Sequence, residues 1–598
     1  MNGLIVFNSA NDVVYQKLNC KLREHIYEKA FSQGLLPEDF YKDGSAPLQG
    51  NIDANVLLQL FSPLINSQKI MHCQFDNCYA AIQCEHDLNF VFGEVLGFQF
   101  LKISQDRLEY MQRQMGVLMS LAKHLHGPNL FASDVQEELF SKCMEYYEDE
   151  IWDQDLILQV EALPRLLINT ELRRAVKGSL DRALDCLRDS GHSRCHAILF
   201  VGVKFVSINS SRNAMQLSPS DLLFLALLIR SLQKDSRSLN KTVAVFLQGL
   251  SQDPHSGCVP CIAHLNKLNK GEVLIQIVEY APLPVACSLY DTLYVLQKII
   301  SIQMQGDVEA LKPTYESLES FIRQSIDALK KAKLKGDDLE ICLKKFSSKW
   351  ENLRKMYNEF LKTYERDLIV RIESNIPSFQ EDLKQLFTMA CCDSSAINFQ
   401  QLPEVASVVE GKLLEFSEFL AVKAERNISI EAYLEDFPGL IHFIYINRSS
   451  GLMISPDLKS STPLIPCENL SEMLEFSRTH LKKGHSSVMW KDKSFNYAYF
   501  LWFEDQTTGS SKSIDLQKPF NASQHSANAF KPNFEPGLLA GDYYHLLTEA
   551  CFPKTPANKI KCYELYCVHL GLVTATCAVE HSRRLVATIS DVVGDDVF

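Results

Sequence analysis

One order of elements occurs three times along the 598-residue chain, and this repetition limits the fold more than any other feature. Each copy reads as two short strands, a helix, further strands and closing helices. The first strands of the three copies begin at Leu4, Cys195 and Leu440. They share the order of their elements and not their residues. The sequence therefore predicts an α/β (α+β) protein of three similar modules, each a mostly antiparallel sheet with flanking helices.

The third copy begins with YLEDFPGLIHFIYINRSSGLM, Tyr433 to Met453. Its strand from Leu440 to Ile446 is apolar on both faces, which predicts a central strand covered on each side. We expect a neighbouring domain to supply the cover opposite the helices. Alternation along the strand places its side chains in two sets: Leu440, Ile444 and Ile446 on one face, and Ile441, Phe443 and Tyr445 on the other. Two helices, Asn558 to Leu570 and Ala575 to Ile589, are expected to close this copy.

The second copy carries the clearest helix start, in LSPSDLLFLALLIRSL. Ser218, Pro219 and Asp221 are typical of an N-cap, a first-turn proline and an N3 acid. Between the second and third copies, apolar residues at helical spacing predict an antiparallel hairpin over Glu309 to Arg366. Shorter helices are expected over Ser378 to Met389 and Val405 to Ala424. The predicted domains are 1–165, 166–304 and 426–598, with a helical connector over 305–425.

The net charge and the lengths of the apolar runs limit which ligands and which cellular compartment we expect for the chain. The formal net charge of −13 has the wrong sign for a polynucleotide ligand. The longest strongly apolar run, Leu222 to Ile229, is far shorter than the roughly 20 residues that span a bilayer. The first residues lack a basic segment typical of a signal peptide. The 18 cysteines then indicate a reducing compartment, so we expect a cytoplasmic chain.

The usual catalytic motifs do not occur in the sequence: there is no Gly-x-Ser-x-Gly, phosphate-cradling glycine loop or His-Glu-x-x-His. CVPC, with Cys258 and Cys261, has the spacing of half a zinc site, but it has no second pair and lies on a predicted strand. A structural role is favoured. A denser group of possible metal ligands consists of His72, Cys73, Cys78, Cys84 and His86. A turn expected near Asp76 would prevent these side chains from sharing one face of a strand, so we favour a role in the core.

Two groups of charged residues are candidate sites. Glu435 and Asp436 resemble an acid and base pair, yet adjacent residues of an extended chain point in opposite directions. A capping or turn role is favoured for them. Four lysines near a predicted helix end could contact anionic lipid, although solvation beside the helix C-terminus is the simpler interpretation. They are Lys330, Lys331, Lys333 and Lys335.

The opening stretch of the third copy, with SFNYAYFLWFED, GLLAGDYYHLL and IKCYELYCVHLGLV after it, closely resembles the tri-longin family that includes the Hermansky-Pudlak syndrome type 1 protein. HAILFVGVKFVSINSS and LSPSDLLFLALLIRSL resemble the central segment of that family. The first 150 residues match only in pattern. The chain departs from the family where QKDSRSLNK replaces a long polar insertion, which puts any regulation by that insertion in doubt.

The resemblance implies three longin modules and a function. The related protein pairs with the Hermansky-Pudlak syndrome type 4 protein in biogenesis of lysosome-related organelles complex three, a guanine nucleotide exchange factor for Rab 32 and Rab 38. It implies a heterodimer subunit without covalent catalysis, cofactor or metal, recruited peripherally to endosomal, lysosomal or lysosome-related organelle membranes such as the melanosome. The rival hypotheses are a longin trafficking scaffold or Rab effector and, from the cysteine clusters alone, a metal or thiol enzyme.

In related complexes the first modules of both subunits form the GTPase platform. The resemblance therefore points to the helix NVLLQLFSPLINSQK. Its polar side supplies the candidate Rab or partner contacts, which are Gln59, Ser62, Asn66, Ser67 and Lys69. The simpler alternative is that these side chains contact only solvent, because a protein surface has more exposed polar residues than residues that contact a partner. The turn from Asn8 to Val13 is the second place to look.

Overall fold

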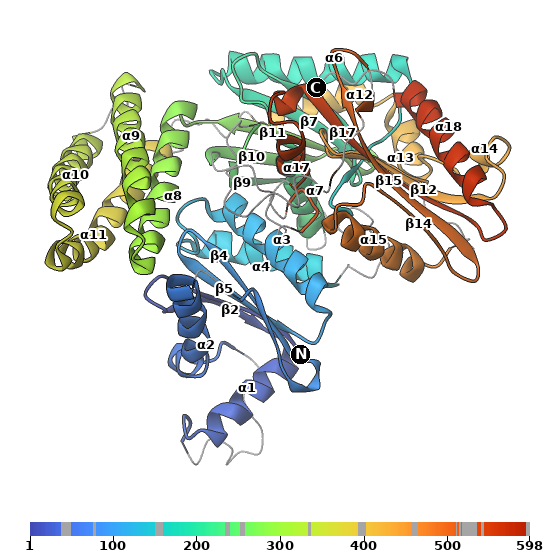
Figure 1. Ribbon diagram of the computed structural model, residues 1–598. Helices are drawn as coiled ribbons and strands as arrows, with labels where there is room; N and C mark the ends of the chain where they lie inside the picture. The colour runs from blue at the N-terminus through green and yellow to red at the C-terminus, as the bar shows by residue number, and fades with distance from the viewer. Residues whose placement is uncertain are drawn as a thin grey trace. The chain divides into compact units, whose positions relative to one another are not determined.

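The structure is a computed structural model of the chain (Figure 1). It divides into two compact units. The first comprises Met1–Ser141, Ala244–Cys261 and Glu279–Ile397, and the second comprises Lys142–Val243, Ile262–Val278 and Asn398–Phe598. The structure describes residues 1–37, 50–75, 79–149, 160–233, 240–250, 258–332, 337–392, 402–456, 465–509, 511–512, 516, 535–539 and 543–593.

The first sheet has the order β2-β1-β5-β4-β3, with every neighbouring pair antiparallel. Its strands are β1 (Asn2–Phe7), β2 (Val13–Leu18), β3 (Ala81–Gln83), β4 (Asn89–Val95) and β5 (Phe98–Ser104). One core cluster packs α1 (Cys20–Ser32) and α2 (Ala54–Phe75) against one face of it. α3 (Leu108–His126) lies on the other face, where Gly93 leaves room for Met115 and Met119 (Figure 1). α4 (Asp134–Asp149) follows α3.

Helix α1 is an addition to the predicted order of elements, which has a single helix after the first two strands. The side chain of Asn19 caps its first turn by accepting a hydrogen bond from the Leu22 amide at 2.9 Å. Leu22, Ile26 and Ala30, spaced four apart, are buried. The capping residue and this spacing are both visible in the sequence, so the helix was within reach of prediction.

The second sheet has the order β8-β7-β11-β10-β9. Its strands are β7 (Cys195–Val201), β8 (Lys204–Ser210), β9 (Asn240–Leu247), β10 (Val259–Lys267) and β11 (Glu272–Glu279), and its helices are α6 (Thr170–Asp189), α7 (Pro219–Gln233) and α8 (Leu283–Gln305). The predicted capping box of α7 is confirmed. The Ser218 hydroxyl accepts from the Asp221 amide at 3.1 Å, and the Asp221 carboxylate accepts from the Ser218 amide at 2.8 Å.

The third sheet has the order β14-β15-β17-β12-β13-β6, and a short strand β16 (Ser511–Lys512) also pairs with β15. Its strands are β6 (Leu163–Pro164), β12 (Leu440–Asn447), β13 (Leu452–Ile454), β14 (Ser487–Lys491), β15 (Phe495–Asp505) and β17 (Ile560–Leu570). α15 (Cys467–Lys482) and α17 (Tyr543–Cys551) pack on one face, and α18 (Ala575–Val593) packs on the other. The four-residue helix α14 (Glu431–Leu434) precedes β12.

The prediction of a helix over Asn558 to Leu570 was wrong, because Ile560–Leu570 is strand β17, paired with both β12 and β15. Its side chains alternate between the two core clusters: Leu565 and Cys567 face α18, while Tyr566 and Val568 face α15 and α17. A short, nearly continuous apolar run fits a buried helix and a buried strand equally well by periodicity. Pairing with the two neighbouring strands makes this run a strand.

Strand β12 is central and buried on both faces, as predicted. The cover opposite α15 is α18 of the same module, so the expectation that a neighbouring domain covers this face was wrong. A bulge between Leu440 and His442 also corrects the predicted sides. Leu440 faces α18 together with Phe443 and Tyr445, while Ile441 joins Ile444 and Ile446. The extra residue of a bulge shifts the alternation by one.

The connector differs from the prediction in the bounds and number of its later helices. The expected hairpin is present as α9 (Val308–Ala332) and α10 (Asp337–Thr363), joined by contacts of Tyr315 with Trp350 and Tyr357. α11 (Arg366–Cys391) begins well before the predicted Ser378. α12 (Leu402–Leu413) and α13 (Ser417–Glu425) replace the single helix expected over Val405 to Ala424.

One described helix, α8, is apolar and long enough to cross a membrane by length and composition. Over the apolar window of this helix, 61% of the residues are buried inside the fold. They pack in one core cluster with α9, α10 and α11. This burial is typical of a core helix in a multi-layered protein.

Candidate functional site

The candidate contact residues lie on one exposed stripe of α2. Gln59, Asn66 and Ser67 are exposed, and Ser62 and Lys69 are partly exposed. The opposite side of the helix, which includes Leu57, Phe61 and Ile65, is buried in the core of the first module. Positions three or four apart share a helical face, so the predicted polar side of the helix is one continuous surface.

The hairpin turn between β1 and β2 reaches the same stripe. Lys69 Nζ donates to Asn11 Oδ1 at 2.6 Å, and Asn11 Nδ2 donates to Asn66 Oδ1 at 3.1 Å. Asn11 has a φ of 69°, a left-handed conformation that asparagine tolerates better than most residues. The two places suggested by the sequence, α2 and the Asn8 to Val13 turn, therefore form one surface.

We call this the hairpin–α2 surface, made of Asn11, Gln59, Ser62, Asn66, Ser67, Lys69 and Ile70. Ile70 is 49% exposed within the polar stripe. Pro63, inside the helix, has no amide hydrogen to donate to the Gln59 carbonyl oxygen. The surface thus offers amide and hydroxyl groups, one ammonium group and an apolar side chain. Such a set of groups can recognise a protein surface.

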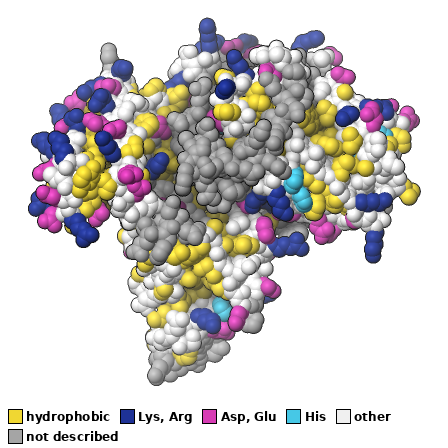
Figure 2. Space-filling view, in the orientation of Figure 1, with side chains coloured by type: hydrophobic (Ala, Val, Ile, Leu, Met, Phe, Trp, Pro, Cys, Tyr) yellow, Lys and Arg dark blue, Asp and Glu magenta, His cyan; other side chains and the backbone are white. Residues whose placement is uncertain are grey.

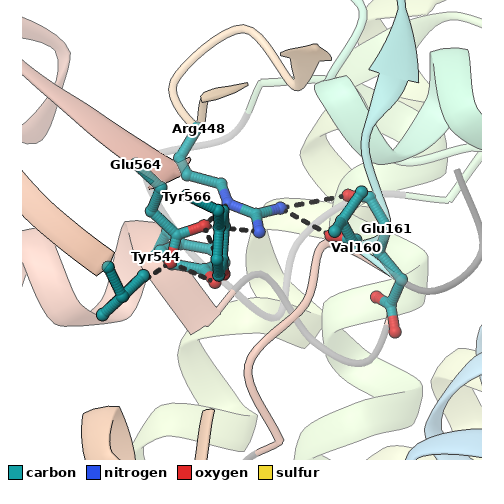
Figure 3. A network of polar contacts seen from close by, with 7 residues as sticks. Val160, Glu161, Arg448, Tyr544, Glu564 and Tyr566 are labelled. Carbon is teal, nitrogen blue, oxygen red and sulfur yellow. Dashed lines mark hydrogen bonds and ion pairs between the residues drawn. The ribbon is translucent and has the colours of Figure 1, made fainter. Parts of the chain in front are cut away.

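A network of hydrogen-bonded polar side chains lies elsewhere, buried in the third module (Figure 3). Arg448 follows β12, and its Nε and Nη2 atoms both lie 2.6 Å from Glu564 Oε2 on β17. Tyr499 and Tyr544 each donate to Glu564 Oε1 at 2.8 Å. The Arg448 and Glu564 side chains are 1% and 0% exposed. No ligand can reach them without opening the core.

Arg448 also ties this module to the segment that precedes the second module. Its Nη1 atom donates to the carbonyl oxygens of Val160 at 2.8 Å and Glu161 at 3.2 Å (Figure 3). Burial alone would lower the pKa of Arg448, but Glu564 holds that pKa above its ordinary value. The guanidinium group also stacks on the Tyr544 ring at 4.1 Å.

This buried ion pair is a structural element, and the sequence reasoning missed it. Its signal was a lone glutamate, Glu564, in the middle of the apolar run that forms β17. A charge in such a position must be paired to be buried. The partner, Arg448, lies 116 residues away in the sequence. Sequence spacing alone does not reveal a pair of that separation.

The two cysteine-containing candidates differ in their exposure to solvent. Cys258 and Cys261 are buried, and burial raises the pKa of Cys258 well above its usual range. Within the described ranges, no three His, Cys, Asp or Glu side chains are arranged to hold a metal ion. In the denser group Cys84 is exposed, whereas Cys78 and the side chains of His72, Cys73 and His86 lie outside the described residues.

The charged candidates are solvent-facing. Glu435 and Asp436 are exposed after α14, beside the turn into β12. Lys330 and Lys331 are exposed in the last turn of α9, and Lys333 and Lys335 lie outside the described residues. Figure 2 shows cationic and anionic side chains interspersed on the face that it displays, including over the helices α9 to α11. Mixed charge of this kind is typical of a solvated surface.

Comparison with known families matches all three modules. The profile of the first longin domain of FUZ, MON1 and HPS1 matches residues 2–149. The second longin domain of the same proteins matches residues 192–298, and the third matches residues 439–592. The three matches follow one another in the family order and coincide with the three sheets.

Proposed function

Because the chain belongs to the tri-longin family of FUZ, MON1 and HPS1, we propose that it is one subunit of a heterodimeric guanine nucleotide exchange factor for Rab 32/38-type GTPases. The observation that carries the proposal is the complete set of three family longin domains. Tri-longin chains are typical of trafficking proteins and exchange-factor subunits. The specific GTPase and partner rest on the closer resemblance of the segments from Cys195 and Tyr433.

Exchange of this kind needs no reacting side chain. The factor binds the nucleotide-free GTPase more tightly than the loaded GTPase, and this difference lowers the barrier to nucleotide release. A thousandfold faster release requires about 4 kcal/mol of differential binding. A protein surface of amide, hydroxyl, ammonium and apolar groups is chemically sufficient for that, and the hairpin–α2 surface is the candidate on this chain.

The partner would be a second tri-longin chain, similar to the Hermansky-Pudlak syndrome type 4 protein. The complex would act on the cytoplasmic face of endosomal, lysosomal or lysosome-related organelle membranes, to which it binds peripherally. The alternative is a longin scaffold or Rab effector. An effector prefers the GTP form, because it reads the ordered switch loops, whereas an exchange factor competes with nucleotide.

The test compares Rab 32-type GTPase in three states: nucleotide-free, GDP-bound and bound to a GTP analogue. We expect the purified heterodimer to retain most GTPase in the nucleotide-free state and to release it when GTP is added. Release of fluorescent GDP should accelerate only when both subunits are present. Strongest retention of the GTP-analogue form, without acceleration, would replace the exchange factor with the effector scaffold.

A further inference from the structure

The turn between β17 and α18 presents leucine side chains to solvent. Leu572 is 94% exposed, the largest exposed fraction among the large hydrophobic side chains of the described residues, and Leu570 is 44% exposed. Phe495, which lies opposite Leu570 in the ladder between β15 and β17, is partly exposed. An exposed leucine costs little by itself, but a protruding group of apolar side chains marks an interaction site.

This turn is held firmly in place. The Gly571 amide donates to the Ser494 carbonyl at 2.8 Å, and the Leu570 amide donates to the Gly439 carbonyl at 2.8 Å. Asn496 Nδ2 donates to the Val573 carbonyl at 3.1 Å. Two separate segments, the start of β15 and the turn before β12, therefore fix the backbone on either side of Leu572. The exposure of its side chain is a property of the fold and not of a loose loop.

Positive charge surrounds the leucines on one side. Lys491 lies beside Gly571, because a Cβ at that glycine would be 3.5 Å from Lys491 Cε, and Lys493 follows in the same exposed turn. The intervening Asp492 accepts hydrogen bonds from the Ser494 and Phe495 amides at 2.6 and 2.7 Å. Its Oδ2 atom accepts from the Tyr497 hydroxyl at 2.7 Å. The carboxylate is thus directed into its own turn, while the two ammonium groups face solvent.

The N-terminus of α18 adds to this charge. The helix begins at Ala575, directly after the turn, and carries no acidic residue in its first turn. Thr574, Ala575 and Thr576 are exposed. The first amide groups of a helix carry a partial positive charge that favours anions. On the opposite side of the turn, beyond Gly439, the exposed carboxylates of Glu435 and Asp436 limit the positive area to the lysine side.

We propose that this tip, made of Lys491, Lys493, Leu570, Leu572 and the first turn of α18, docks on an anionic membrane surface. The leucines would enter the boundary between headgroups and acyl chains, and the two lysines and the helix N-terminus would face lipid phosphates. The proposal goes beyond nucleotide exchange, since it concerns where the protein is held and not what it does to a GTPase. It predicts that binding depends on both apolar insertion and lipid charge.

The test is flotation of the full-length chain, in the soluble complex that it forms, with vesicles of phosphatidylcholine alone or with 30% phosphatidylserine. The anionic vesicles should bind about tenfold more protein at low salt, and added salt should weaken binding. Leu572→Glu should lose most of this binding. Lys491→Glu with Lys493→Glu should lose the preference for phosphatidylserine.

Ile341→Glu is the matched control, because Ile341 on α10 is 63% exposed and lies outside the tip. It should leave flotation unchanged. Each variant is first checked for an unchanged melting temperature and for unchanged GDP release without vesicles, so failure of the docking proposal is distinct from failure of the exchange proposal. Equal flotation of Leu572→Glu and the parent protein would overturn membrane docking. Loss of a protein subunit from the Leu572→Glu complex would assign the tip to a protein partner instead.

Discussion

Glu272 carries a carboxyl group in a buried environment, which disfavours the charged form of that group. It is the first residue of β11 and it is fully buried. Burial raises the pKa of Glu272 to about 7. A side-chain hydrogen bond from Ser417 lowers this pKa, and the negative charge of Glu410 raises it. Burial therefore dominates.

The burial of Glu272 predicts that the stability of the protein depends on pH. Between about pH 4.5 and pH 7 the folded state keeps a proton on Glu272 that the unfolded state releases, so the free energy of unfolding falls as pH rises through that window. Glu272→Gln removes the charge and should stabilise the protein by roughly 1–3 kcal/mol at about pH 8, with little effect below about pH 5. Urea denaturation at the two pH values measures the difference.

The exposed Glu415, in the turn between α12 and α13, provides the control. Glu415→Gln should change stability equally little at both pH values, because an exposed carboxylate loses no hydration on folding. Parallel stability curves for the parent protein and Glu272→Gln would show that Glu272 is hydrated or paired in solution.

At the scale of elements, α2 and the β1–β2 turn act together. The sequence suggests each of them separately as a contact, and the hydrogen bonds of Asn11 to Lys69 and Asn66 join them. Helical spacing predicts the polar stripe of α2, because a helix repeats every 3.6 residues. No local pattern predicts that Asn11 reaches across to it. The pairing depends on how α2 crosses the first sheet.

Charge reversal on this surface should slow nucleotide release. Lys69→Glu combined with Asn66→Ala and Ser67→Ala removes the ammonium group and two polar side chains from one stripe. We expect about tenfold slower GDP release, or about 1.4 kcal/mol of lost differential binding, with the heterodimer intact by size-exclusion chromatography.

The matched control is Lys29→Glu, an exposed charge reversal on α1 of the same module. It should leave exchange unchanged. If the triple variant also exchanges at the parental rate, α2 is not the GTPase contact, and the turn from Asn8 to Val13 becomes the next position to vary.

At the scale of the molecule, exposed apolar side chains gather where the connector meets the third module. Leu414, Phe419 and Val422, on and beside α13, are 61%, 50% and 60% exposed. Several large apolar side chains exposed within one short segment are typical of a surface that another protein covers. This observation agrees with the proposed second tri-longin subunit.

Expressed alone, the chain should therefore aggregate or remain bound to chaperones. Co-expression with the tri-longin partner should yield a monodisperse complex of one copy of each, because an obligate interface buries apolar surface that neither subunit covers by itself. Light scattering coupled to size-exclusion chromatography measures this. A stable monomer whose melting temperature does not change on addition of the partner would contradict the proposal.

Local sequence patterns are sufficient to predict the features that depend on neighbours along the chain. The three-fold order of elements, the capping box of α7 and the central strand β12 follow from local patterns of capping residues, helical spacing and apolar runs. These patterns were sufficient for the fold class, which the family comparison supports. The polar stripe of α2 was predictable for the same reason.

Features that depend on distant segments are set by strand pairing and packing in the folded chain. The run from Ile560 to Leu570 is a strand because β12 and β15 bond to both of its edges. The bulge at Leu440 to His442 sets which side chains of β12 face α18. Glu564 can be buried as an ion because the fold brings Arg448 to it. Each of these is settled by hydrogen bonds and packing between residues far apart in sequence, on which local propensity has no influence.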